Sequence, residues 1–389
     1  MKYIKQILLF LFLFLASCQK QERKVFSEDS YTIHVSVSKE PFSDIAEYLK
    51  LSKLVRLDDE PLVAPIKDIE IVNDRIVVLD ITSRILCYDM NGKNQFVIDA
   101  KGSGPGEYSN IGFFSVDEKN DEIWLYDYSQ AMFYRYSLKN GKFLKRSFQR
   151  KPAPVDVAFE DGMYYYDSPD HRNYMNDRDL HYSLLVSEDG KTMEKTHFPH
   201  DDAEHDFGFL ASGKSFYRSG DLLYCKNFSR DVYVLNGGDI HHRYEFVIPD
   251  WLSHGVIERR MDIRALLKSD YAYGLCDIFE CNGMLSFRFS KSGFIYSGLY
   301  DLKEGRQVYC APMARGVPGS EVPIISAIVG AYQSQFVSVL SLEYLYSYKK
   351  QHPNALEELL PDYDADDGNP VIAFYDVVCS TIPVLIRAS

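Results

Sequence analysis

The sequence lacks an excess of positive charge. Its 389 residues contain 43 lysines and arginines but 56 aspartates and glutamates, which gives a formal net charge of −13 at pH 7. Nucleic-acid backbones are polyanions, and the proteins that bind them do so largely through basic stripes on their surface. Because no such stripe stands out in this chain, the sequence predicts no nucleic-acid partner.

The sequence also lacks the short motifs that mark common metal, redox and hydrolase sites. It contains no CxxC pair, no HExxH helix motif and no GxSxG nucleophile elbow. Two acidic stretches remain, at residues 197–206, which include three histidines, and at residues 362–368. We interpret both as solvated loops, the first in preference to a zinc site, because neither has the spacing of a metal motif. The sequence therefore predicts no metal and no cofactor.

Cysteine is scarce, and its placement favours buried thiols over disulfides. Apart from Cys18, the cysteines stand singly in apolar stretches, where Cys behaves as a small hydrophobic residue. These are Cys87, Cys225, Cys276, Cys281, Cys310 and Cys379.

The one long apolar run, residues 7–15, lies at the N-terminus behind Lys2 and Lys5. It is too short to span a bilayer, and it ends in Leu-Ala-Ser followed by Cys18. This ending resembles the lipobox of bacterial lipoproteins, in which the cysteine is lipidated and becomes the new N-terminus. We predict a signal peptide at residues 1–17, a lipid-anchored tether at residues 18–30 and one domain at residues 31–389.

What the sequence does have is tyrosine and phenylalanine, with 29 and 24 copies, and a repeated pattern of short strands. Residues 66–148 contain the pattern twice, as three alternating apolar strands and a fourth after an Asn-Gly turn. The two copies are joined by the glycine-rich stretch 101–108. Looser copies follow at residues 155–198, 208–248 and 276–310. The spacing is roughly 40 to 45 residues, which is the length of a β-propeller blade.

The last repeat is composite. Residues 324–329, 335–340 and 371–377 supply three strands, and an early strand, at Tyr31 or at Leu54, could supply the fourth and close the ring. Helices are expected in three places. They are residues 41–49, an amphipathic helix within 249–273 with Leu267 on its apolar side, and residues 342–360, broken near Pro353 with Ser341 and Asn354 as N-caps.

The lipobox, the repeated strands, the stretch 101–108 and the final Asn-Pro-Val-Ile-Ala-Phe-Tyr at residues 369–375 together resemble the six-bladed β-propeller lipoproteins of the Bacteroidetes. The resemblance implies an all-β fold of six four-stranded antiparallel blades, closed by N- and C-terminal strands and carrying short helical insertions. It implies no particular activity. In that family an acidic run after the cysteine accompanies export to the cell surface. The sequence lacks this run, so we expect the periplasmic side of the outer membrane.

Blade crossings and the turns between second and third strands open on the same face of a propeller, and the longest irregular stretches fall in these two classes of loop. We therefore expect a protein or glycan ligand on this face. The glycines of 101–108 are interpreted as allowing positive φ, rather than as cradling phosphate. Asp80 and Asp127 are better explained as holding their own turns, since they repeat from blade to blade, but both could still line a pocket on this face. The candidate residues are Asp80, Arg84, Glu107, Tyr108, Asp127, Arg172, His200, His205 and Arg230.

The sequence thus favours a lipid-anchored binding or scaffold module. The alternatives are a propeller enzyme that acts on glycans, as a glycoside hydrolase or lyase, and a structural subunit of an envelope complex. Carboxylates clustered at the central channel would favour the enzyme, whereas an open channel with an aromatic, hydrophobic face would favour binding.

Overall fold

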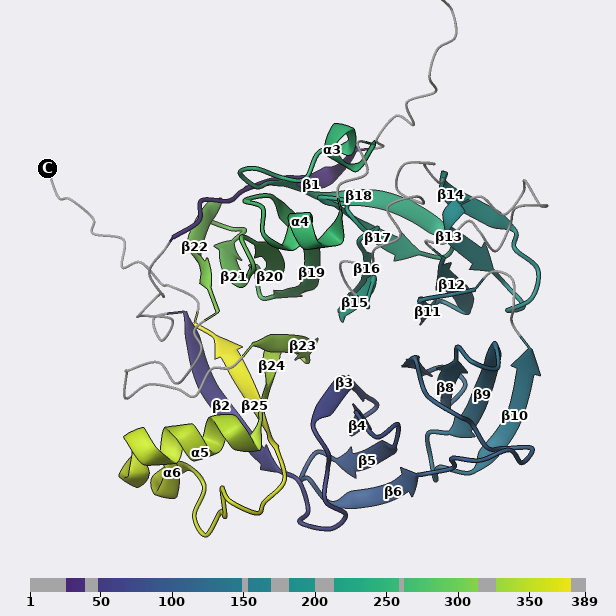
Figure 1. Ribbon diagram of the computed structural model, residues 1–389, viewed down its shortest axis with the longest axis vertical. Helices are drawn as coiled ribbons and strands as arrows, with labels where there is room; N and C mark the ends of the chain where they lie inside the picture. Colours follow the sequence, from purple (N-terminus) through teal and green to yellow (C-terminus); the bar gives the residue numbers. More distant parts are fainter. Residues whose placement is uncertain are drawn as a thin grey trace, which may run out of the picture.

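The structure is a computed structural model, and it describes residues 26–38, 48–148, 153–168, 182–199, 213–258, 262–313 and 327–378. Six antiparallel sheets surround a central axis like the blades of a propeller (Figure 1). The predicted fold class is confirmed. Each blade has its first strand beside the axis and its fourth strand at the rim.

Blades 1 and 2 are the two copies of the repeat in residues 66–148. Blade 1 contains β3 (Ile66–Val72), β4 (Arg75–Asp80), β5 (Ile85–Asp89) and β6 (Asn94–Ile98). Blade 2 contains β7 (Phe113–Asp117), β8 (Glu122–Asp127), β9 (Met132–Ser137) and β10 (Phe143–Phe148). The second strands are almost entirely buried because both of their faces pack against neighbouring blades.

Blades 3 to 5 follow the same plan. Blade 3 contains β11 (Asp156–Glu160), β12 (Met163–Asp167), β13 (Tyr182–Ser187) and β14 (Lys195–Pro199). Blade 4 contains β15 (Phe216–Ser219), β16 (Asp221–Tyr224), β17 (Asp231–Asn236) and β18 (Asp239–Val247). Blade 5 contains β19 (Ala272–Cys281), β20 (Met284–Lys291), β21 (Phe294–Asp301) and β22 (Arg306–Pro312).

Blade 6 closes the ring. It combines β23 (Ile328–Tyr332), β24 (Gln335–Leu340) and β25 (Val371–Val377) with β2 (Leu49–Arg56), which comes from the other end of the chain. β2 pairs antiparallel with β25, from Leu49 opposite Val377 to Arg56 opposite Val371. Of the two early strands considered for this role, the one around Leu54 closes the ring.

The other early strand, β1 (Phe26–His34), pairs in parallel with β18 and gives blade 4 a fifth strand. β1 begins at Phe26, whereas the sequence analysis placed residues 26–30 in a polar tether. Beyond β1, the amide of Ser38 donates to the carbonyl oxygen of Cys310 in β22. The N-terminal segment therefore lies along the rims of blades 4 and 5.

In blades 1, 3, 5 and 6, a tight turn with positive φ joins the first and second strands. Asn73, Asp161, Asn282 and Gln333 all have positive φ in these turns. Asn and Asp tolerate this conformation better than most other residues, and hairpins favour it because it matches the twist of the strands. Asp161-Gly162 and Asn282-Gly283 are turns of this kind, whereas Asn91-Gly92 and Asn140-Gly141 join third and fourth strands.

The helices differ from the prediction in detail. The expected single helix in residues 249–273 is two short helices, α3 (His254–Glu258) and α4 (Ile263–Leu267). Val256 and Ile257 are buried, but Leu267 is 47% exposed, and Leu266 takes its expected place in the interior. These helices pack on a small apolar cluster that includes Phe228 of blade 4.

Blade 6 carries α5 (Leu342–Gln351) and α6 (Pro353–Leu359) between β24 and β25. The Ser341 hydroxyl accepts from the amide of Tyr344, which confirms the predicted N-cap. Asn354 is not the cap of the second helix, because Pro353 occupies the first helical turn and His352 precedes it. The helix expected at residues 41–49 falls largely outside the described residues.

The five cysteines among the described residues are free thiols, and all except Cys276 are buried. Burial raises the pKa of Cys87 to about 11 and that of Cys310 to about 12. The interpretation as buried thiols thus holds for most of them. Cys379 lies outside the described residues.

Candidate ligand-binding site

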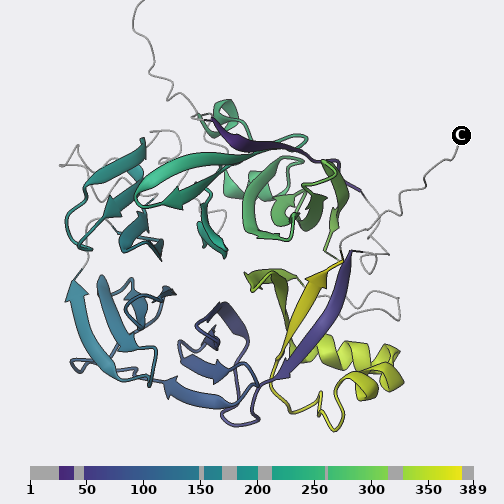
Figure 2. The same cartoon turned by 180° about the vertical axis from the view of Figure 1, so that it is seen from behind.

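We call the face that bears the blade crossings and the second-to-third-strand turns the loop face, and the opposite face the turn face. Helices α4 and α5 lie in front of the strands in Figure 1 and behind them in Figure 2, so Figure 1 views the loop face. The candidate residues that the structure describes belong to the loop face and have different roles there.

Asp80 holds its own turn. Its Oδ1 accepts hydrogen bonds from the amides of Thr82 and Arg84, at 2.9 and 3.1 Å, and the Arg84 guanidinium lies 2.7 Å from Oδ2. Burial alone would raise the pKa of Asp80, but the hydrogen bonds from Thr82 and Arg84 outweigh it and lower this pKa. The side chain of Asp80 is fully buried, so it presents no group to a ligand.

Asp127 repeats this arrangement in blade 2 and adds a link to the blade crossing. Its Oδ1 accepts from the amide of Ser129 at 2.8 Å, and its Oδ2 accepts from the amide of Ser109 at 2.7 Å. The carboxylate therefore fixes the turn and the incoming crossing together. The interpretation of these two aspartates as turn formers agrees with their hydrogen bonds.

The glycine-rich crossing is organised by Glu107. Its Oε2 accepts from the amide of Gly104 at 2.8 Å, and a Cβ added to Gly102 would lie 2.0 Å from the same oxygen. A Cβ at Gly106 would lie 2.9 Å from the ring of Phe143. These three glycines do not have positive φ, so that explanation of the motif was wrong. Side chains occupy the places where their Cβ atoms would be.

Of the other candidates, two are described and three are not. The Tyr108 side chain is buried, and its hydroxyl donates to the carbonyl oxygen of Ser83 at 2.8 Å. Tyr108 therefore ties the crossing to the turn of blade 1. Arg230 is 45% exposed and lies 3.6 Å from the Glu245 carboxylate. Arg172, His200 and His205 lie outside the described residues.

None of the charged residues that line the central channel was among the candidates from the sequence. Charged side chains from the inner strands of blades 1 and 3, and from the crossing into blade 4, meet inside the channel. We call this group the waist, and it consists of Asp68, Glu70, Asp156 and Lys214. The Lys214 ammonium lies 2.7 Å from Oδ1 of Asp68. Asp156 accepts from the amide of Ser215 at 2.9 Å, and Glu70 accepts from the amide of Val116 at 3.2 Å.

This waist holds one ammonium among three carboxylates. Burial raises the pKa of Glu70 and of Asp156 to about 7 each, although Lys214 pulls both in the opposite direction. Burial works against the charged form of Lys214, but attraction to Asp68, Glu70 and Asp156 outweighs it and raises this pKa. Lys214 therefore stays charged, while Glu70 and Asp156 each change from the protonated to the ionised form near neutral pH.

A cavity of about 410 Å³ lies at the loop-face end of the channel. Its wall is partly apolar, with Ile66, Leu79, Phe113, Val329 and Val339. Its charged groups are paired with protein partners: Asp68 with Lys214, and Asp277 with Arg288. Lys67 differs, because its ammonium donates to the backbone carbonyls of Ile111 and Gly112, at 3.0 and 2.6 Å.

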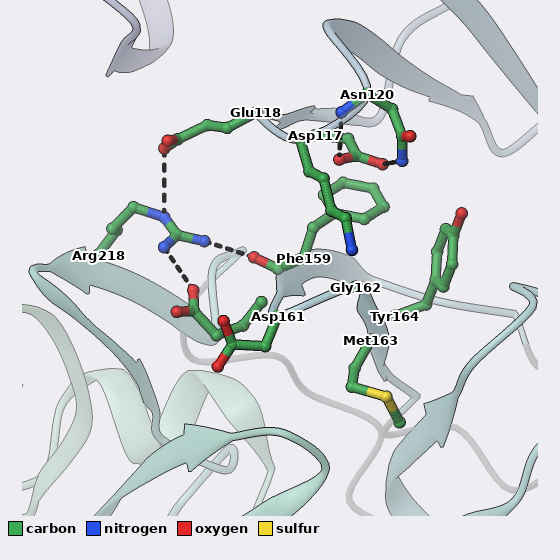
Figure 3. Close-up of a pocket in the computed structure, with 11 residues that line it drawn as sticks. Asp117, Glu118, Asn120, Phe159, Asp161, Gly162, Met163, Tyr164 and Arg218 are labelled. Atoms are coloured by element: carbon green, nitrogen blue, oxygen red, sulfur yellow. Dashed lines mark hydrogen bonds and ion pairs between the residues drawn. The ribbon is translucent and has the colours of Figure 1, made fainter.

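A second cavity, of about 440 Å³, lies at the turn-face end and is lined by polar residues of the inner turns, including Asn73, Asn282 and Tyr332. Arg218 separates it from a smaller hollow between blades 2 and 3. The Arg218 guanidinium lies 2.6 Å from the carboxylate of Glu160 and 3.8 Å from that of Glu118 (Figure 3). The cation at this end is therefore held by two carboxylates.

Within the described ranges, no group of three histidine, cysteine, aspartate or glutamate side chains is placed to hold a metal ion. The stretch 197–206 falls mostly outside these ranges. In the part of the chain that the structure describes, no helix has the length and apolar character to cross a membrane.

Comparison with solved structures supports the fold. A protein of Bacteroides fragilis described as exported aligns with a TM-score of 0.72 and 20% identity, over 90% of this chain and all of that one. A member of the DUF4221 family from Bacteroides vulgatus aligns with a TM-score of 0.50 and 10% identity, over 85% of this chain and 99% of that one. A search of curated proteins gave no match.

The family model described as "Domain of unknown function (DUF4934)" matches residues 30–376, which include every blade. The match and the two Bacteroides structures agree with the resemblance drawn from the sequence. The chain, a six-bladed β-propeller, belongs to the DUF4934 family.

Proposed function

We propose that this propeller is a lipid-anchored, extracytoplasmic binding module whose ligand enters the central channel from the loop face. The observation that carries the proposal is the cavity of about 410 Å³ at that end of the channel. Its size falls within the range of small-molecule sites, and an apolar wall with a few fixed charges is the usual composition of such sites.

The chemistry of the cavity supports a ligand with an apolar body and an anionic or polar group. Among the described residues, the Lys67 ammonium donates hydrogen bonds to backbone carbonyls and forms no close ion pair, so a ligand carboxylate or hydroxyl can approach it. An oligosaccharide with an acidic group, or a protein segment with a terminal carboxylate, fits this description.

The proposed cellular location of the protein rests on its N-terminal sequence. The pattern at residues 1–18 supports export and lipidation at Cys18, and the similarity to an exported Bacteroides protein is consistent with export. The anchor would hold the propeller at the outer membrane, on the periplasmic side.

Carboxylates do cluster at the channel. Such a cluster was expected for the alternative function, an enzyme that acts on glycans. Here Lys214 pairs with Asp68, and backbone amides engage Asp156 and Glu70. Each carboxylate thus already contacts a group of the protein, although the single ammonium of Lys214 does not neutralise all three. We therefore prefer binding.

Two measurements test the proposal. Replacing Cys18 with Ser is expected to remove incorporation of labelled fatty acid and to release the protein from the membrane fraction. Soluble protein starting at residue 19 is then screened against an oligosaccharide array and a membrane extract, with glycan cleavage assayed in parallel.

For a ligand found in this way, Lys67→Met is expected to weaken binding about tenfold, the effect of one lost charge-assisted hydrogen bond. Lys303→Met, on an exposed turn-face lysine, is the matched control and should leave binding unchanged. Equal affinity of both variants would place the ligand elsewhere, and glycan cleavage would favour the enzyme.

A further inference from the structure

The rim of blade 2 presents an open strand edge. β10 pairs with β9 on one side, and among the described residues no strand pairs with its other side. Blade 4 shows what can happen at such an edge, because there β1 adds to β18 as a fifth strand. The backbone of β10 thus offers the kind of edge that this chain elsewhere covers with a strand of its own.

The side chains of β10 are unusually apolar for an exposed edge. Phe143, Leu144 and Phe148 are 39%, 47% and 64% exposed. No other outer strand of the described blades exposes three large apolar residues. Proteins commonly protect open edges with lysine, and Lys145 could serve in this way. Three neighbouring apolar side chains counteract that protection and instead favour contact with a partner.

The charge of the strand is opposite to that of the molecule. Residues 142–148 read Lys-Phe-Leu-Lys-Arg-Ser-Phe, with three basic residues and no acidic one, in a chain of net charge −13. Lys145 is 55% exposed and lies 3.6 Å from Glu122, a distance at which a solvated pair contributes little. A partner that carries carboxylates would complement this strand.

The start of the strand is held rigidly. The Phe143 ring packs edge-on against Tyr136, with ring centroids 5.6 Å apart, and also covers Gly106 of the glycine-rich crossing. The Tyr136 hydroxyl in turn lies 2.5 Å from the carbonyl oxygen of Gly106. An edge that is ordered before binding loses less conformational entropy when a partner pairs with it.

We propose that the outer edge of β10 is a docking strand for an extended acidic peptide segment of a partner protein. The peptide pairs with the β10 backbone as a fifth strand of blade 2. Its apolar side chains cover Leu144 and Phe148, and its carboxylates meet Lys145, which lies on the opposite face of the strand from Phe148. This surface lies on the rim, so the inference goes beyond ligand binding in the channel and does not depend on it.

The test uses the soluble chain from residue 19 and a fluorescent eight-residue peptide of alternating glutamate and valine. We expect saturable binding in fluorescence anisotropy, weakened as salt rises. The double variant Leu144→Glu and Phe148→Glu should weaken binding at least tenfold. Phe294→Glu, at a residue that is 53% exposed on blade 5, is the matched control and should bind like the wild type.

Two further arms separate strand addition from simple charge attraction. A peptide N-methylated at alternate residues has lost amide donors and should not bind. Lys145→Glu should lose the glutamate peptide and gain a lysine–valine peptide, which also shows that this variant is folded. Binding that survives N-methylation, equal competition by phosphatidylglycerol vesicles, or dimerisation of the free chain through this edge would overturn the proposal.

Discussion

At the scale of single residues, the most unusual feature is the group of charges at the channel waist. Each of the carboxylates Asp68, Glu70 and Asp156 contacts Lys214 or a backbone amide, yet one ammonium cannot neutralise three carboxylates. Burying such groups costs free energy unless a proton replaces the missing partner. Proton binding by Glu70 and Asp156 removes this excess of buried negative charge.

The waist should make stability depend on pH. The pKa values of Glu70 and Asp156 are raised by burial to about 7, above those of unfolded carboxyl groups, so the folded state binds more protons between about pH 4 and pH 7. Their contribution to stability is complete below pH 4 and is lost as pH rises through 7. In thermal melts, Glu70→Gln should reduce the loss of Tm between pH 5.5 and pH 8.

Glu304→Gln, at an exposed turn residue, is the control for this experiment and should keep the wild-type slope of Tm against pH. The comparison of slopes matters more than either slope alone, because the net charge of −13 also adds repulsion as pH rises. An unchanged slope in Glu70→Gln would mean that Glu70 is ionised throughout this range.

At the scale of elements, Asn369 joins the two ends of the chain. Its Oδ1 accepts from the amide of Val63 at 2.8 Å, and its Nδ2 donates to the carbonyl oxygens of Asp58 and Pro61. Asn369 is fully buried just before β25, and these partners lie between β2 and β3. One amide side chain therefore fixes the approach of the final strand to the segment that leads into blade 1.

Asn369→Ala should lower the free energy of unfolding by about 2 kcal/mol, because it leaves a buried amide and two carbonyls without their partner. Urea unfolding followed by circular dichroism measures this loss. Asn91→Ala, at an exposed turn residue, should change stability little. If Asn369→Ala lowers the free energy of unfolding by less than Asn91→Ala does, water replaces the hydrogen bonds of the Asn369 side chain.

At the scale of the molecule, closure depends on β25 much more than on β1. β25 pairs on both sides, with β2 and with β24, whereas β1 is an additional strand at the rim of blade 4. Removing β25 separates β2 from the rest of blade 6 and opens the ring. Removing β1 leaves all six four-stranded blades complete.

Two truncations test this difference. A chain that ends at residue 370 should lose its cooperative thermal transition and aggregate. A chain that starts at residue 36 should remain monomeric and fold, with a lower Tm because β18 loses its neighbour. Size-exclusion chromatography and thermal melts distinguish the two results. Similar damage from both truncations would contradict the assigned role of β25.

The sequence predicted the fold well because each blade repeats the same local chemistry. Alternating apolar residues and an Asn-Gly or Asp-Gly turn need no knowledge of distant contacts. The channel could not be predicted in this way, since Asp68, Asp156 and Lys214 belong to different blades and meet only once the ring is formed. The contact of Glu107 with its neighbouring glycines is local, yet no known sequence pattern shows that its carboxylate folds back onto them.

The pairing of β2 with β25 also has a consequence for how the protein is made. A ribosome or a secretion channel delivers the chain from its N-terminus, so residues 49–56 arrive long before residues 371–377. This most distant pairing forms slowly, because its loop closure must wait for everything between. We expect the ring to be sealed only after residues 371–377 have emerged, which leaves β2 in need of protection until then.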